Sequence, residues 1–298
     1  MSTHKVQVGF IGLGIMGRPM AGHILKAGYP LSVYNRTASK AEELASQGAR
    51  VRSSPAEVAS DSEVMITMVS DSPDVEEVIA GPAGVAQAIK PDSVVVDMST
   101  ISPQVERDLN QLLQFKECHL VDAPVSGGDV GAQNASLAIM AGGNRKIFER
   151  VKPILEVMGQ PTYCGPVGCG QLTKLCNQIL VVMTLLGVSE ALAYAKRNDL
   201  DPRVMVEATQ GGAAASWQLS NLAPKIIDRD FAPGFMVDLI DKDLRLVLES
   251  AEASGVSLPG TSLVAQLFKK IQAQGRGREG TQALAKVLES MAEPEAEQ

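Results

Sequence analysis

The sequence predicts an α/β protein in which a doubly wound, mostly parallel sheet is followed by an all-helical domain. In the first half, short β-branched runs alternate with helix-like segments, a pattern typical of parallel sheets with helices on both faces. After residue 165 the pattern is almost wholly helical, with Gly and Pro at the breaks. We therefore predict two domains, at residues 1–164 and 165–298.

The predicted strands are mostly runs that are apolar on both faces, as expected for strands covered by helices on both sides. They are Val6–Ile11, Leu31–Asn35, Val64–Val69, Val94–Met98, Leu120–Ala123 and Leu137–Ala141. Helical patterns lie between several of them, for example at Ala38–Gln47 and Pro103–Phe115. In the second half, the uncharged run Leu175–Ser189 predicts one long helix, buried between domains or subunits.

The composition is that of an ordinary globular protein of 298 residues with a net charge of −7. No long basic run is present, which argues against a nucleic-acid partner. The longest uncharged stretch is short for a membrane span of about 20 residues, and no signal-peptide core opens the chain. We expect a cytoplasmic protein without a membrane partner. The cysteines form no C-x-x-C pair, so we expect buried free thiols and no metal site.

A glycine-rich turn follows the first predicted strand and opens a helix-like segment. Its pattern, G-x-G-x-x-G, is the fingerprint of dinucleotide binding in a Rossmann domain. The glycines permit a tight turn, close approach to a pyrophosphate and close helix packing, and the helix N-terminus then faces the phosphates. A purely structural turn is the alternative. The predicted cofactor contacts here are Gly12, Leu13, Gly14, Ile15, Met16 and Gly17.

The residues that end the second strand predict which cofactor is used. An NAD site usually has an acid there, about 20 residues after the glycines. This chain has Asn35, Arg36 and Thr37 instead, and a guanidinium can bind a 2′-phosphate. We predict NADP, with NAD as the weaker alternative, and expect these three residues to contact it. Arg36 could instead be a solvated loop residue. Val69, at the end of a later strand, is a further predicted cofactor contact.

Four sequence blocks, in this order, resemble the β-hydroxyacid dehydrogenase family over nearly the whole chain. The blocks are Gly9–Ala21, Asp122–Gly128 followed by Gly131 and Ala132, Gly168–Asn177, and Lys242–Leu244. The family includes 3-hydroxyisobutyrate dehydrogenase, tartronate semialdehyde (2-hydroxy-3-oxopropionate) reductase and glyoxylate/succinic semialdehyde reductases. The resemblance implies an NAD(P)-dependent oxidoreductase acting on a small carboxylate-bearing aldehyde or the matching hydroxy acid. We also expect a homodimer or homotetramer.

The resemblance implies that Ser126, Gly127 and Gly128 bind the substrate carboxylate. A hydroxyl and successive backbone N–H groups in a glycine turn can form such an anion-binding concavity, although on its own this sequence would more often be a plain turn. Family members commonly continue with Gly-Thr-Leu, where this chain has Ala135-Ser136-Leu137. Because Ser136 keeps a hydroxyl, we expect only a local adjustment.

Lys174 and Asn177 match the catalytic lysine of the family and its asparagine partner. Their spacing places both on one face of a helix, where both would contact the substrate. Lys174 would give a proton to the carbonyl oxygen as hydride reaches the carbon, and its ammonium would stabilise the developing alkoxide. A lysine heading an apolar helix would otherwise be a snorkelling residue.

Further roles follow from the same resemblance. Lys242 and Thr100 match cofactor contacts, and Phe235 matches an aromatic residue close to the substrate. Trp217 could be either a pocket wall or an ordinary core residue.

The resemblance leaves several functions open. An imine reductase shares this architecture but usually lacks the lysine, and a non-catalytic NADP-binding sensor would lack the lysine or the substrate block. The middle of the chain resembles the tartronate semialdehyde reductases, whereas Asn35–Thr37 resembles the NADPH-using glyoxylate/succinic semialdehyde group. We predict NADPH-dependent reduction of tartronate semialdehyde to glycerate, with 3-hydroxyisobutyrate dehydrogenase and glyoxylate/succinic semialdehyde reductase as alternatives.

Overall fold

The computed structural model describes residues 5–292. Contacts divide the chain into two compact parts, unit 1 (Met1–Lys174) and unit 2 (Leu175–Gln298). The division falls within helix α8 (Cys169–Arg197), later in the chain than the predicted boundary at residue 165. The two units are described separately below.

Unit 1 contains one sheet that is parallel over most of its width. The strand β1 lies between β4 and β2. Two strands run opposite to the others: β8 is antiparallel to β6 and β7, and β9 is parallel to β8. The strand order is β3 (Arg50–Val51), β2 (Leu31–Tyr34), β1 (Val8–Ile11), β4 (Val64–Thr67), β5 (Val94–Asp97), β6 (His119–Asp122), β8 (Leu137–Gly143) and β7 (Val125–Ser126), with β9 (Gly159–Gly165) beside β8. The predicted doubly wound Rossmann sheet is confirmed.

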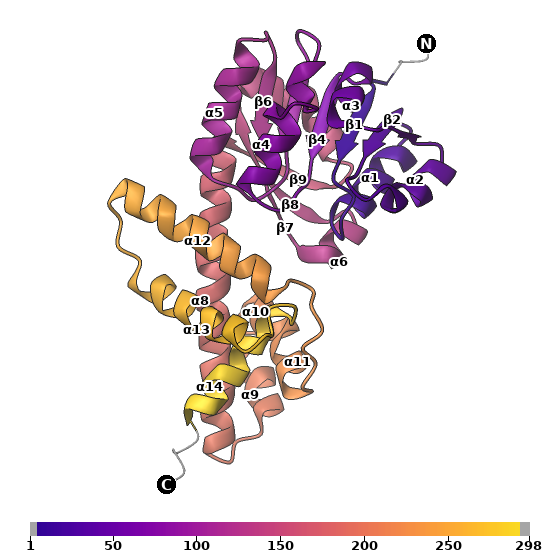
Figure 1. Cartoon of the computed structure of the whole chain (residues 1–298). Helices are drawn as coiled ribbons and strands as arrows, with labels where there is room; N and C mark the ends of the chain where they lie inside the picture. The colour runs from indigo at the N-terminus through magenta and orange to yellow at the C-terminus, as the bar shows by residue number, and fades with distance from the viewer. Residues whose placement is uncertain (1–4, 293–298) are drawn as a thin grey trace. The chain divides into compact units, whose positions relative to one another are not determined.

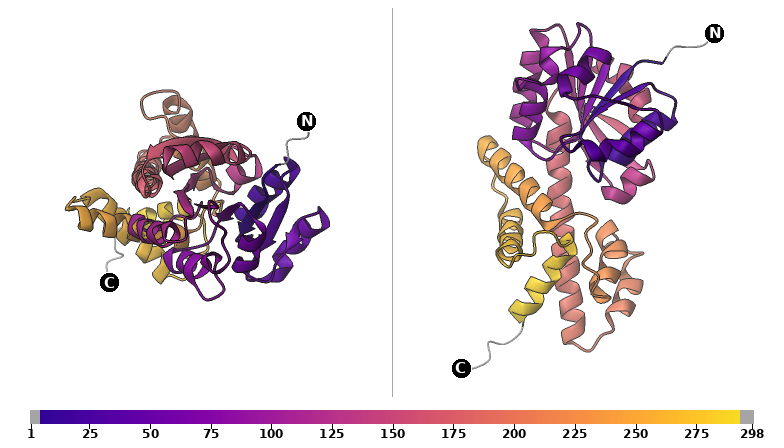
Figure 2. Two further views of the ribbon diagram at one scale, coloured as in Figure 1. Left: turned by 90° about the horizontal axis from the view of Figure 1, so that it is seen from above. Right: turned by 45° about the vertical axis from the view of Figure 1, so that its right-hand side comes forward.

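Helices cover both faces of this sheet, as Figures 1 and 2 show. Along β4, Val64 and Ile66 pack into one core, whereas Met65 between them packs into the other, because successive strand side chains point to opposite faces. The first face is covered by α1 (Gly17–Lys26), α2 (Glu42–Ser46), α6 (Gly128–Gln133) and α7 (Arg145–Leu155), and the second by α3 (Pro55–Asp61), α4 (Ser72–Ala80) and α5 (Pro103–Gln114). Short 3₁₀ turns lie at Ala38–Ala41 and Val85–Gln87.

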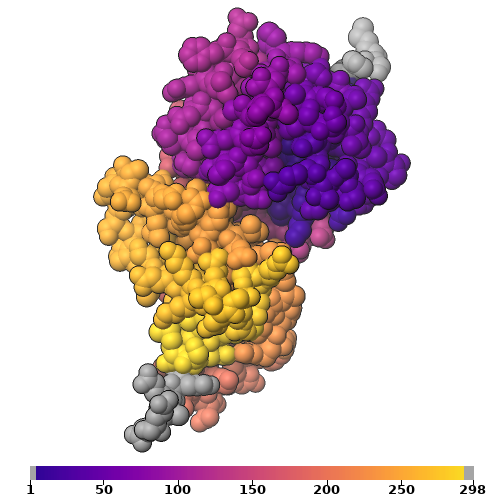
Figure 3. All heavy atoms as spheres, viewed as in Figure 1, coloured from indigo at the N-terminus to yellow at the C-terminus, as the bar shows by residue number. Residues whose placement is uncertain are grey.

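The described part of unit 2 is helical apart from one isolated β-bridge, between Met236 and Gly280, as predicted. Val182 and Leu185 of α8, Ile240 of α12 and Phe268 of α13 meet in its core. Besides α8, the elements are α9 (Pro202–Thr209), α10 (Trp217–Asn221), α11 (Ala223–Ile227), α12 (Val237–Ser254), α13 (Pro259–Ala273), a 3₁₀ turn (Thr281–Ala283) and α14 (Leu284–Ala292). Figure 3 shows, on one face, the outer surface that the heavy atoms of each unit form.

Helix α8 is the predicted long apolar helix and is continuous from Cys169 to Arg197 (Figure 2). Among the described residues it is the one helix that could cross a membrane by length and composition, a test that core helices of soluble proteins also pass. Only 44% of its most apolar window is buried. Leu180 and Tyr194 are 68% and 72% exposed. The predicted helix is therefore present, but within this chain it is buried on one side only.

Candidate active site

The glycine turn after β1 leaves open space above its middle glycine. A Cβ on Gly12, whose φ is +99°, would lie 2.2 Å from the carbonyl oxygen of Met68, and a Cβ on Gly17 would lie 1.9 Å from that of Gly12. A Cβ on Gly14 would meet nothing within 4 Å. The outer glycines are thus required by the packing of the turn itself, whereas Gly14 leaves room for a pyrophosphate in front of the first N–H groups of α1.

Asn35 holds this turn against the end of β2. Its Oδ1 accepts a hydrogen bond from the N–H of Leu13 at 2.8 Å, and its Nδ2 donates to the carbonyl of Thr37 at 2.9 Å. The adjacent Arg36 side chain is 89% exposed and lies 3.7 Å from the carboxylate of Asp74 on α4. The structure therefore gives Asn35 a role in ordering the turn, and leaves the guanidinium of Arg36 accessible to a phosphate that would compete with Asp74.

The loops that follow β4 and β5 are tied together by one hydroxyl. Val69 donates its N–H to Ser99 Oγ at 3.0 Å, and Ser99 Oγ donates to Asp97 Oδ1 at 2.7 Å. Both loops lie at the carboxyl ends of parallel strands, where open α/β sheets bind their ligands. The predicted cofactor residues Val69 and Thr100 are thus held at the same edge of the sheet.

The amide of Gln171 brackets Thr100. Its Oε1 accepts from the N–H of Ile101 at 3.1 Å, and its Nε2 donates to the carbonyl of Ser99 at 2.9 Å. A side-chain amide thus pairs with the backbone on either side of Thr100, as a neighbouring peptide would. Gln171 lies in the first turn of α8 and was not a predicted site residue.

Asp122, at the end of β6, caps the same turn of α8. Its two carboxylate oxygens accept from the N–H groups of Gly168 and Gln171, each at 2.8 Å. Burial raises the pKa of Asp122, while these two backbone hydrogen bonds act in the opposite direction. Lys174 lies almost one turn after Gln171 and is only 7% exposed. The predicted catalytic lysine is therefore held by a helix end anchored to two strands of the sheet.

The predicted carboxylate site forms one turn between β7 and α6. Ser126 ends β7, and Gly127 and Gly128 follow with φ of +136° and +64°. Two successive left-handed residues can turn their N–H groups towards one anion, and the hydroxyl of Ser126 is half-buried beside them. Beyond α6, Ala135 also has a positive φ, +52°, at the position where the family commonly has glycine. Alanine thus replaces the family's usual glycine at a position where the backbone is left-handed.

In unit 2, Asn177 and Lys242 belong to one hydrogen-bonded network. Asn177 Nδ2 donates to Gln178 Oε1 at 2.8 Å, and Gln178 Nε2 donates to Asp243 Oδ2. Lys242 Nζ lies 2.8 Å from Asp243 Oδ1, and the two side chains are 15% and 3% exposed. The structure therefore joins a predicted catalytic residue to a predicted cofactor residue through Gln178 and Asp243, neither of which was predicted.

The two aromatic candidates of unit 2 lie in different surroundings. Phe235 is half-buried and packs against the core of the unit. Trp217 begins α10 and is 61% exposed, so the interpretation of Trp217 as an ordinary core residue is wrong.

The expectation of buried thiols is correct only for Cys118. Cys164, on β9, and Cys169 are half-buried, and Cys176 is exposed because α8 presents one side to solvent.

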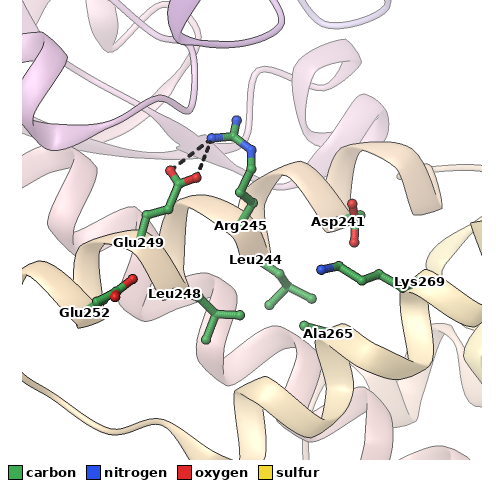
Figure 4. Close-up of a pocket in the computed structure, with 8 residues that line it drawn as sticks. All are labelled: Asp241, Leu244, Arg245, Leu248, Glu249, Glu252, Ala265 and Lys269. Atoms are coloured by element: carbon green, nitrogen blue, oxygen red, sulfur yellow. Dashed lines mark hydrogen bonds and ion pairs between the residues drawn. The ribbon is translucent and has the colours of Figure 1, made fainter.

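A cavity of about 220 Å³ lies between α12 and α13 (Figure 4). It contains none of the predicted site residues; its lining is Asp241, Leu244, Arg245, Leu248, Glu249, Glu252, Ala265 and Lys269. Arg245 is paired with Glu249, and burial raises the pKa of Asp241, with Lys269 acting in the opposite direction. Its lining has three acidic and two basic side chains, and we assign the cavity no role in the reaction.

The fold and the open glycine turn define an NAD(P)-dependent oxidoreductase. Residues 7–188 match the family described as the NAD binding domain of 6-phosphogluconate dehydrogenase. Residues 168–288 match that described as NAD-binding of NADP-dependent 3-hydroxyisobutyrate dehydrogenase. The chain belongs to the β-hydroxyacid dehydrogenase family.

Individual relatives carry different substrate names. The chain is 42% identical to a 3-hydroxyisobutyrate dehydrogenase-like protein of Arabidopsis thaliana, covering 98% of this chain and 87% of the relative. It is 41% identical to 2-hydroxy-3-oxopropionate reductase of Escherichia coli, covering 96% and 98%. A solved structure of Mycobacterium tuberculosis 3-hydroxyisobutyrate dehydrogenase with L-serine superposes with a TM-score of 0.88 at 29% identity, covering 95% and 99%.

Proposed function

We propose that this enzyme uses NADPH to reduce a small aldehyde that carries a carboxylate, with tartronate semialdehyde as the substrate and glycerate as the product. The observation that carries the proposal is the turn at Ser126–Gly128. Its two left-handed glycines and the half-buried Ser126 could together bind an anion, in the unit that also contains the dinucleotide turn.

The residues divide the work of the reaction between binding and proton transfer. The bound cofactor supplies the hydride. The turn at Ser126–Gly128 holds the substrate carboxylate and so fixes which end of the molecule reacts. Lys174 gives its proton to the carbonyl oxygen, where negative charge develops, and Asn177 orients the ammonium or the substrate oxygen.

The choice of substrate rests on the relatives and on the expected anion site. The E. coli relative is named for 2-hydroxy-3-oxopropionate, which is tartronate semialdehyde. The M. tuberculosis structure contains L-serine, which is itself a β-hydroxy carboxylate. The Arabidopsis relative, equally similar, favours a second candidate, the interconversion of methylmalonate semialdehyde and 3-hydroxyisobutyrate. Both substrates place a carboxylate at the same distance from the reacting carbon.

The proposed preference for NADPH rests on Arg36. No acid ends β2 to bind a ribose 2′-hydroxyl, and the guanidinium of Arg36 is exposed.

A comparison of initial rates tests the proposal. We expect tartronate semialdehyde to have the highest kcat/KM with NADPH, ahead of methylmalonate semialdehyde, succinic semialdehyde and glyoxylate, and propanal to be poor because it lacks a carboxylate. Ser126→Ala should raise KM for the acids by roughly tenfold, the value of one hydrogen bond to a charged group, with unchanged cofactor affinity. Equal rates on propanal and tartronate semialdehyde would refute the anion site.

A further inference from the structure

Two carboxyl groups, Asp97 at the end of β5 and Glu106 on α5, meet in the interior of unit 1. Both residues are fully buried, with 0% exposure, and their carboxyl groups act directly on each other. Asp97 Oδ1 accepts from the hydroxyls of Thr67 and Ser99. Glu106 Oε1 accepts from Nε2 of Gln171 at 2.8 Å. One oxygen of each carboxyl group is thus engaged by a hydroxyl or amide donor.

The remaining two oxygens, Asp97 Oδ2 and Glu106 Oε2, receive no N–H or O–H group from any residue in the described range 5–292. Two ionised carboxylates can only accept hydrogen bonds, so they would repel each other and stay unsatisfied at a high cost inside the protein. A single proton between them turns one oxygen into a donor and satisfies both.

The surroundings place this proton on Glu106. The charged groups that act on its carboxyl are Asp97 from β5 and Asp122 from β6, and both are acidic. Burial, and then these two carboxylates, raise the pKa of Glu106 well above its ordinary value. Burial also raises the pKa of Asp97, but hydrogen bonds from Glu106, Thr67 and Ser99 act in the opposite direction.

We propose that Asp97 and Glu106 share one proton, carried by Glu106, and that this acid pair positions Gln171 and through it the Thr100 loop and the helix turn before Lys174. Glu106 is thus a positioning residue. Its Oε1 accepts from Gln171 while its hydroxyl donates to Asp97, and Asp97 in turn holds Ser99. Only the effect on turnover rests on the proposed function, because the acid pair also affects folding.

The sign of the pH dependence follows from where the proton is held. The folded protein keeps the proton of Glu106 at pH values at which the unfolded chain has lost it. The unfolded state therefore binds fewer protons in that range, and stability falls as pH rises. The stabilising contribution is fully present below the ordinary pKa of a glutamate and is lost as pH approaches the raised pKa of Glu106. Ionisation there would push Glu106 from Asp97 and loosen Gln171.

Glutamine at position 106 separates this proposal from a purely structural role. In Glu106→Gln the amide nitrogen can donate to Asp97 while the carbonyl still accepts from Gln171, as in the protonated acid, but the group cannot titrate. Asp108 lies on the same helix and is exposed, so Asp108→Asn is the matched control. The free energy of unfolding and kcat are measured for each variant from below the ordinary pKa of a glutamate up into the alkaline range.

We expect Glu106→Gln to keep most of its turnover near neutral pH and to lose the fall in stability and kcat that the parent shows as pH rises above the ordinary pKa of a glutamate. Glu106→Ala should lower kcat roughly tenfold at every pH, as expected for one buried hydrogen-bonded group. In the double variant Asp97→Asn/Glu106→Gln two amide NH₂ groups face each other, and the loss should exceed the sum of the single variants. Asp108→Asn should follow the parent.

Two results would overturn the proposal: a fall in stability with rising pH in Glu106→Gln equal to that of the parent, or turnover of Glu106→Ala equal to that of the parent. If Glu106→Ala does not fold, the stability profile of Glu106→Gln still decides. If no aldehyde is reduced by the parent, the proposed function fails, whereas the unfolding measurements still test the shared proton.

Discussion

The two units solve the same electrostatic problem in different ways. Asp97 in unit 1 and Asp243 in unit 2 are both buried carboxylates. Asp97 meets a second acid, Glu106, and we assign a shared proton to the pair. Asp243 meets the ammonium of Lys242 at 2.8 Å. In unit 1 a proton thus removes one of the two charges of the acid pair, whereas in unit 2 a cation offsets the charge of Asp243.

In both units, the buried acid orients a glutamine of α8. Glu106 accepts from Gln171, whose amide brackets Thr100, and Asp243 accepts from Gln178, which accepts from Asn177. The two glutamines are seven residues apart on one helix, which is about two turns. In both cases a buried acid fixes the orientation of a glutamine amide, and the amide in turn fixes the position of a predicted site residue. This arrangement works whether the acid is protonated or ion-paired.

The largest effect should come from a substitution that alters neither of the two buried acids. Lys174→Ala should lower kcat by about 10²–10⁴-fold, the range for a lost general acid, while NADPH affinity and stability stay close to those of the parent. Single-turnover kinetics and fluorescence titration of the cofactor separate chemistry from binding. Lys174→Arg should restore little, because a guanidinium does not give up its proton readily. A Lys174→Ala enzyme with more than about a tenth of parental turnover would require another acid.

The next largest effect should come from a substitution that removes the ion pair of unit 2. Lys242→Met leaves Asp243 buried without its cation, and removing one partner of a buried pair costs about 3–5 kcal/mol. Chemical denaturation measures the loss, and the double variant Lys242→Met/Asp243→Asn should recover most of it because the charge is gone. A loss below about 1 kcal/mol in the single variant, the size of an exposed pair, would mean that the buried pair contributes little.

The exposed pair Arg36–Asp74 provides the surface counterpart of these buried groups. Arg36→Ala should weaken NADPH by roughly tenfold, one hydrogen bond to a charged group, and leave NADH unchanged. Asp74→Asn should strengthen NADPH by a few-fold at most, because exposed pairs contribute about 0–1 kcal/mol. Parallel titrations with both cofactors measure the two changes. Equal effects of Arg36→Ala on NADPH and NADH would contradict binding of the 2′-phosphate.

The smallest effect concerns the backbone alone. Ala135 is left-handed, with φ of +52°, a conformation that costs a non-glycine residue about 1–2 kcal/mol. Ala135→Gly removes this cost but adds the larger entropy of glycine in the unfolded chain. Thermal unfolding should therefore show a net gain of about 0.5–1 kcal/mol, independent of pH. Destabilisation would show that the Ala135 methyl group makes a favourable contact.

The sequence predicts the sheet well where its strands are buried on both faces. Each predicted strand is present, with its ends moved by a few residues. The strands β3, β7 and β9 were missed. Both residues of β3 are exposed and β7 has only two residues, so neither shows a hydrophobic pattern. The residues of β9 are half-buried or exposed, because this strand lies at an edge of the sheet. It also contains Pro161, which an edge strand tolerates.

The predicted site residues lie in turns, in helices and at the end of a strand, but several of the groups that hold them were not predicted. Glu106 did carry a signal. It shares the buried stripe of α5 with Pro103, Leu109 and Leu113, so helical periodicity places an acid inside. The bond from Gln171 to Ile101 joins residues 70 positions apart, and no local pattern predicts such a contact.

The hydrogen bonds of Gln171 on either side of Thr100 restrict how this sequence can vary. Gln171 uses both amide hydrogens and its carbonyl oxygen at once. A glutamate in its place would put a carboxylate oxygen, which can only accept, against the carbonyl of Ser99 and the carboxyl oxygen of Glu106. A shorter asparagine would not reach both sides of the loop. Replacement of Gln171 therefore requires a second change in the Ser99–Ile101 loop or at Glu106. These positions should be inherited, or transplanted into a designed reductase, as one set.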